Sequence, residues 1–167
     1  MIDAIRLLLF PMLMAIAAAS DFVTMTIPNK ISLALTAGFL TLAAMMGMGL
    51  GEVGSHVGAG ATVLLVAVGF FACGWIGGGD AKLAAATALW FGFDHLFAYL
   101  MDAALLGGGL TILLIYFRLI PLPSILHGHA WAERLHQKGS GVPYGIALAA
   151  AALLVYPDTL WMKGVGA

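Results

Sequence analysis

Charged side chains are scarce in this 167-residue sequence. Asp, Glu, Lys and Arg make up 9% of the residues, whereas 62% are hydrophobic, and soluble domains carry about 25% charged residues. A water-soluble domain of this length leaves too much of its surface wet to hide so many apolar side chains. The composition therefore excludes an ordinary soluble domain and predicts a chain that lies in the hydrocarbon of a bilayer.

Cysteine and net charge are nearly absent as well. The single cysteine, Cys73, can form neither an internal disulfide nor a multi-cysteine zinc site, so we interpret it as a small packing residue. The net charge is -1, and nucleic-acid binding normally requires an excess of Lys and Arg. We therefore expect no nucleic-acid partner.

Long apolar runs, separated by short polar breaks, fill the chain instead. Several of them are long enough to cross a hydrocarbon core about 30 Å thick. The pattern predicts an all-α integral membrane protein, one transmembrane domain over residues 1–167, built as a bundle of about six helices. The expected helices are 4–20, 31–50, 57–75, 81–93, 96–118 and 142–161.

The basic residues predict the orientation of these helices. If segments 21–30, 76–82 and 118–141 share one side of the membrane, that side holds five of the seven basic residues, namely Lys30, Lys82, Arg118, Arg134 and Lys138. Basic residues concentrate on the cytoplasmic side of membrane proteins, so both chain ends should lie outside the cytoplasm. We interpret four aromatic residues as anchors at the membrane interface: Trp75, Trp90, Trp161 and Tyr156.

Two aspartates, Asp21 and Asp80, fall at helix ends on this same predicted side. Each has an ordinary interpretation: Asp21 as a wetted helix end, and Asp80 as a helix N-cap. However, ionisable groups at a membrane edge are costly and often functional, and Asp80 follows the glycine run 77–79. Glycines at 77 and 79 leave room for another backbone beside the carboxylate. Two adjacent carboxylates would share one proton, which is the arrangement that aspartyl proteolysis requires.

The residues around these aspartates resemble a known family. The run Gly77-Gly78-Gly79-Asp80-Ala81-Lys82-Leu83 looks like the glycine-x-glycine-aspartate motif of type IV prepilin peptidases. Asp21 followed by Ile27-Pro28-Asn29 is similar to the other catalytic segment of that family. Val142-Pro143-Tyr144-Gly145 resembles its proline-tyrosine-glycine signature.

The resemblance implies a six-helix membrane aspartyl protease that cuts the leader peptides of prepilins or pseudopilins at the cytoplasmic face of the inner membrane. It implies Asp21 and Asp80 as the catalytic pair, with no metal or organic cofactor. It implies supporting roles for Gly77, Gly79, Lys82, Pro28 and Asn29. Lys82 is equally interpreted as an anchor that extends to the membrane surface.

The chain departs from the family in two places. Only ten residues separate the first two expected helices, where longer members carry a cytoplasmic domain. The chain therefore resembles the short, protease-only members that serve tight-adherence (Flp) pili, and we expect no N-methyltransferase activity. Segment 22–26 also lacks the arginines that relatives often carry after the first aspartate.

Other ionisable residues leave alternatives open. With Asp102, the two aspartates could instead form the proton relay of a small transporter or channel. His127, His129 and His136 lie in one polar segment; we interpret them as solvated, because a metal site needs three or four convergent ligands. The sequence does not identify the prepilin, the preference around the scissile bond or the oligomeric state.

Overall fold

The computed structural model describes residues 2–163, which form helices without any strand. The predicted all-α fold is therefore confirmed. Three helices are long and apolar enough to span a membrane: α1 (Ile2–Thr24), α3 (Leu50–Ala72) and α4 (Gly78–Leu119). The remaining helices are α2 (Asn29–Met45), α5 (Ala130–His136) and α6 (Tyr144–Val155), with 3-10 turns η1 (Ser124–Leu126) and η2 (Tyr156–Asp158).

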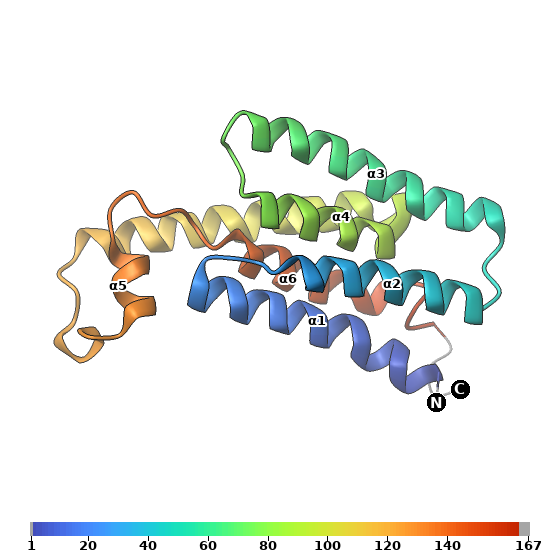
Figure 1. The fold of residues 1–167 in the computed structure, drawn as a ribbon, viewed down its shortest axis with the longest axis horizontal. Helices are drawn as coiled ribbons and strands as arrows, with labels where there is room; N and C mark the ends of the chain where they lie inside the picture. Colours follow the sequence, from blue (N-terminus) through green and yellow to red (C-terminus); the bar gives the residue numbers. More distant parts are fainter. Residues whose placement is uncertain (1, 164–167) are drawn as a thin grey trace.

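Helix α4 reverses direction at Gly92. The backbone there has φ 60° and ψ -172°, a conformation that is essentially restricted to glycine. Figure 1 shows the second part of α4 running back along the bundle. The two parts correspond to the predicted helices 81–93 and 96–118. Together with α1, α2, α3 and α6 they make six apolar segments.

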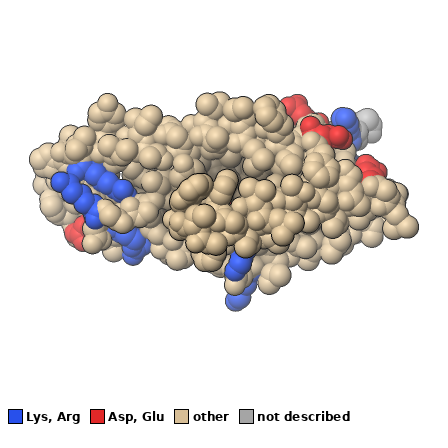
Figure 2. All heavy atoms as spheres, turned by 90° about the horizontal axis from the view of Figure 1, so that it is seen from above, with Lys and Arg blue, Asp and Glu red and all other residues tan. Residues whose placement is uncertain are grey.

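The connections between helices gather at two opposite ends of the bundle. The α1–α2 and α3–α4 connections and the short helix α5 lie at one end, and both chain termini lie at the other (Figure 1). Lys and Arg gather at the α5 end of the visible face, and most of the visible Asp and Glu lie near the termini (Figure 2). On this face, basic residues thus predominate at the α5 end and acidic residues at the end with the termini.

The core is aromatic and contains residues that we had placed at the membrane interface. Trp90 and Trp161 are completely buried, and Tyr156 is 3% exposed. The indole N–H of Trp90 donates to the Leu35 carbonyl at 2.9 Å, and that of Trp161 donates to the Trp90 carbonyl at 2.6 Å. Internal carbonyls thus replace the water that an indole would find at an interface. The anchor interpretation was wrong for these three residues; Trp75 is exposed.

A buried arginine joins the two ends of the chain. The Arg6 guanidinium donates to the carbonyls of Trp161 at 2.7 Å, Lys163 at 2.7 Å and Leu160 at 3.3 Å. In return, the Tyr156 hydroxyl donates to the Arg6 carbonyl at 2.6 Å. The guanidinium offers five N–H donors, so one side chain satisfies several carbonyls left free after α6.

Candidate active site

Asp21 and Asp80 line the same cavity although 58 residues separate them in sequence. Asp21 lies in the last turn of α1 and Asp80 in the first turn of α4. The cavity has a volume of about 310 Å³ and lies at the end of the bundle that holds the α1–α2 and α3–α4 connections. Its other lining residues are Met25, Thr26, Ile27, Gly77, Gly78 and Gly79. The fold therefore brings together the two carboxylates that were predicted to form the site.

Asp21 is held in place by the start of α6. It is 4% exposed, and its Oδ2 accepts a hydrogen bond from the backbone N–H of Gly145 at 2.7 Å. The first N–H groups of a helix have no partner within the helix, so Gly145 can donate to a side chain. A Cβ at position 145 would lie 2.8 Å from Asp21 Oδ2 and 2.7 Å from Ile27 Cδ1. The site therefore requires glycine here.

Gly145 was not among the predicted site residues. The motif Val142-Pro143-Tyr144-Gly145 was noticed in the sequence, but the sequence alone assigns it no contact. In the structure, the backbone N–H of its glycine donates to Asp21, and its tyrosine ring packs against Gly107 of α4. The only available signal was the motif itself.

Gly77 and Gly79 make room for different neighbours. A Cβ on Gly77 would lie 2.8 Å from Asp80 Oδ2, so this glycine leaves space for the carboxylate. A Cβ on Gly79 would lie 3.2 Å from Ile27 Cβ and 3.4 Å from the Ile27 backbone nitrogen. The close backbone beside Gly79 is thus the connection between α1 and α2, whereas we expected space for an incoming chain there.

That connection is held by local hydrogen bonds. The Ser20 and Thr24 hydroxyls donate to the Thr26 carbonyl at 2.9 Å and 3.2 Å. Met25 has φ 56°, a left-handed conformation that is uncommon outside glycine and indicates local strain. Its N–H donates to the Asp21 carbonyl at 2.8 Å. The bend thus closes directly behind Asp21 and directs Ile27 into the cavity.

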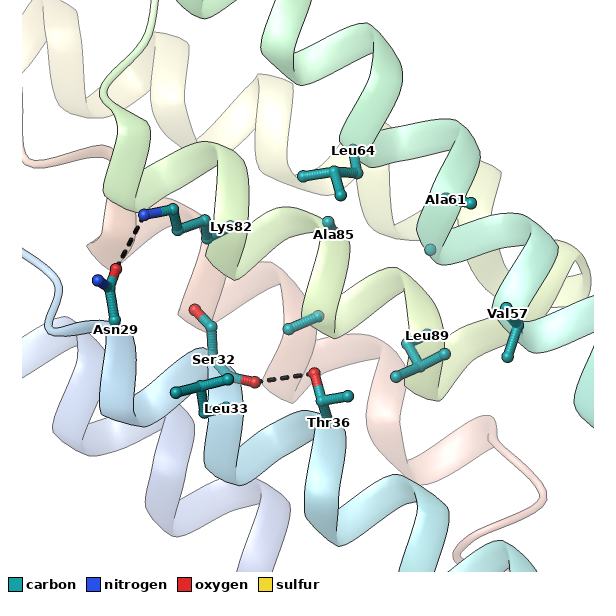
Figure 3. A pocket seen from close by; sticks show the side chains of 12 residues that line it. Asn29, Ser32, Leu33, Thr36, Val57, Ala61, Leu64, Lys82, Ala85 and Leu89 are labelled. Atoms are coloured by element: carbon teal, nitrogen blue, oxygen red, sulfur yellow. Dashed lines mark hydrogen bonds between the residues drawn. The ribbon is translucent and has the colours of Figure 1, made fainter.

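Lys82, Asn29 and Pro28 lie next to this cavity, outside its lining. Lys82 Nζ donates to Asn29 Oδ1 at 3.0 Å, and the two residues line a neighbouring groove (Figure 3). Pro28 is the residue before α2, with φ -61° and ψ 137°, where its fixed φ suits the approach to a helix.

The short helix α5 packs against the end of α1. The Phe22 and Trp131 ring centroids are 5.0 Å apart, and Arg134 donates to the Val23 carbonyl. Arg118 Nε also donates to the Leu135 carbonyl at 2.8 Å, which ties the helix to the end of α4. The short helix α5 is thus attached to the bundle beside the helix end that carries Asp21.

The other ionisable candidates lie outside the cavity. Asp102 is half-buried on the returning part of α4 and does not line it. His136 Nδ1 lies 3.1 Å from the Phe117 carbonyl. Within residues 2–163, no group of three His, Cys, Asp or Glu side chains converges as a metal site would require.

These features define a class: a helical membrane protein with two carboxylates in one cavity at the end of its bundle. In a comparison with family models, residues 8–112 match the type IV leader peptidase family. The match covers more than half of the chain, so the protein belongs to this family. None of the curated proteins and none of the solved structures matches the chain. The matched range includes both aspartates and ends before Gly145.

Proposed function

We propose that this protein is an aspartyl endopeptidase that removes the leader peptide of type IV (Flp-like) prepilins or pseudopilins. Membership of the type IV leader peptidase family supports a leader-peptidase activity. The observation that carries the aspartyl mechanism is the cavity that Asp21 and Asp80 share. Two carboxylates in one cavity can divide the acid and base roles of peptide hydrolysis.

In this mechanism one carboxylate is ionised and the other carries a proton. The ionised carboxylate takes a proton from water as the water oxygen attacks the scissile carbonyl carbon, and the protonated one donates to the carbonyl oxygen. The tetrahedral intermediate collapses when the C–N bond breaks: the carboxylate that took the water proton passes it to the leaving nitrogen, and a hydroxyl of the intermediate returns its proton to the other carboxylate as the new C=O forms. Gly145 keeps one Asp21 oxygen in place throughout, because positioning is part of the rate enhancement.

The proposal includes an orientation and a restricted activity. The cavity opens at the α5 end, where Lys and Arg gather on the visible face (Figure 2), and such an end faces the cytoplasm by the positive-inside rule. Cleavage then occurs at the cytoplasmic face of the inner membrane. Only residues 25–28 separate α1 from α2, so this connection holds no domain that could carry methyl transfer.

Cleavage of a co-expressed Flp-type prepilin tests this function. Asp21→Asn and Asp80→Asn should each abolish the size shift of the prepilin, because asparagine keeps the shape of aspartate but cannot exchange the proton. The double variant should be scarcely slower than either single variant, since the pair acts as one unit. Asp102→Asn is the matched control, the same substitution outside the cavity, and should retain cleavage.

Protein levels in the membrane must be equal across these variants. A well-expressed Asp80→Asn protein that still trims prepilin at the wild-type rate would refute the aspartyl mechanism. Loss of function in Asp102→Asn alone would favour the proton-relay alternative.

A further inference from the structure

A second hollow lies beside the proposed catalytic cavity. It has a volume of about 490 Å³ and lies between α2, α3 and the first part of α4. Figure 3 shows the first part of α4 as its floor, with side chains of α2 and α3 on either side. Its lining is mostly small or aliphatic: Asn29, Ser32, Leu33, Thr36, Val57, Gly60, Ala61, Leu64, Lys82, Ala85, Ala86 and Leu89. We call this hollow the α2–α3 groove.

The polar end of the groove adjoins the aspartate cavity. Lys82 and Asn29 lie at this end and are joined by a 3.0 Å hydrogen bond. Lys82 follows Asp80 by two residues, and Asn29 follows Ile27 by two; Asp80 and Ile27 both line the aspartate cavity. From Lys82 to Leu89 the floor rises about 10 Å along the bundle. The groove therefore runs from the neighbourhood of the carboxylates along the apolar part of the bundle.

The surface of the groove suits another helix. In lipid, helices associate through small residues that let their backbones approach closely. Such residues line the groove: Ala61, which is exposed, on its wall and Ala85, which is buried, on its floor. Gly60 allows such a close approach within the bundle, because a Cβ at this position would lie 3.2 Å from the Ala85 carbonyl oxygen. Helix α3 therefore lies close to α4 at the floor of the groove. Leu33 and Leu64 lie on opposite walls (Figure 3).

The polar end of the groove offers hydrogen-bond donors where a bound substrate helix would unwind. A protease needs its scissile peptide in extended form, and each carbonyl freed from a helix at the membrane needs a new donor. The Lys82 ammonium has three N–H donors, of which the bond to Asn29 uses one. The Asn29 side-chain nitrogen offers two more.

We infer that the α2–α3 groove holds the transmembrane helix of the substrate, with Lys82 and Asn29 binding the carbonyls of the segment that unwinds toward Asp21 and Asp80. This inference rests on the proposed function and adds a specificity site to it. It explains how a protein with a small catalytic cavity selects a membrane-inserted substrate: the helix in the groove positions the adjoining peptide bond over the carboxylates.

Cysteine cross-linking tests the location of the substrate helix. The protein carries Asp80→Asn to trap the substrate and Cys73→Ser to remove the exposed native thiol. Cysteines at Ala61 and Leu33 on the groove walls should cross-link to a cysteine in the prepilin helix. Ala104→Cys, at an exposed alanine of α4 outside the groove, is the matched control and should give no adduct. Adducts from the control alone, or from no position, would overturn the inference.

A steric variant separates the groove from the chemistry. Ala61→Trp should slow cleavage of membrane-inserted prepilin by about tenfold or more, the effect of losing one important interface contact, whereas Ala104→Trp should not. If Ala61→Trp cleaves at the wild-type rate and only co-purifies with less phospholipid, the groove is a lipid site and the inference fails, although the protease proposal stands. Failure of the wild-type protein to cleave any prepilin would instead refute the proposed function.

Discussion

The backbone N–H of Gly145 donates to Asp21 Oδ2 at 2.7 Å, although the two residues lie 124 positions apart in the sequence. This bond connects the last apolar helix to the end of the first. Since the family match ends at residue 112, α6 lies outside the matched range and still contributes to the candidate site. The orientation of one candidate catalytic carboxylate therefore depends on a helix, α6, that carries no Asp, Glu, Lys, Arg or His of its own.

Replacing that glycine should disable the site without dismantling the bundle. In Gly145→Ala the new Cβ would meet Asp21 Oδ2 and Ile27 Cδ1 within 2.8 Å, so Asp21 must move. A displacement near 1 Å can lower catalysis by about 100-fold, and we expect a loss of that order in prepilin cleavage. Gly109→Ala, at a helical glycine with open space around it, is the control. Equal activity in the two variants would show that Asp21 tolerates the displacement.

The reversal of α4 should depend on glycine at position 92. Gly92→Ala places a side chain at φ 60° and a Cβ 3.0 Å from His56 Nε2. The backbone strain alone should destabilise the fold by about 1–3 kcal/mol. Unfolding in detergent, followed by circular dichroism, measures this loss, with Gly108→Ala as a control in open space. An unchanged midpoint would mean that the chain reverses direction elsewhere.

Arg6 should contribute far more to stability than its neighbour Asp3. Arg6→Met keeps an unbranched, flexible side chain but removes the donors to three C-terminal carbonyls. Hydrogen bonds from a charged donor each contribute about 1.5–3 kcal/mol, so we expect thermal unfolding in detergent at a clearly lower temperature. Asp3→Asn breaks only an ion pair whose carboxylate is exposed, which should be worth less than about 1 kcal/mol. Similar losses in both variants would contradict the clamping role of Arg6.

Labelling of whole cells checks the orientation. In a Cys73→Ser background, cysteines at Asn29 and Lys138 should resist a membrane-impermeant maleimide applied from outside, because both segments lie at the end that we assign to the cytoplasm. A cysteine at Asp158, near the opposite end, should react. Reversed labelling would invert the orientation and place the carboxylate cavity on the outer face.

Hydropathy and spacing predicted the helices well because lipid imposes length and apolarity on every spanning segment. The convergence of Asp21 and Asp80 followed from counting helices, since two helix ends on one side can meet. Hydropathy does not reveal which face of a helix is buried. For that reason the burial of Trp90 and Trp161 was missed, as was the contact between Gly79 and Ile27. These depend on packing between helices that are distant in sequence.

Two of the helical segments that build the site are shorter than the bilayer is thick. The part of α4 before Gly92 is about 21 Å long at 1.5 Å per residue, and α6 has 12 residues, whereas a hydrocarbon core measures about 30 Å. Helices α1 and α3, with 23 residues each, span it fully. Such hydrophobic mismatch makes the surrounding lipid thin locally or leaves the short helices below the surface. The thickness of the host membrane thus affects how readily water and the scissile bond reach the carboxylates.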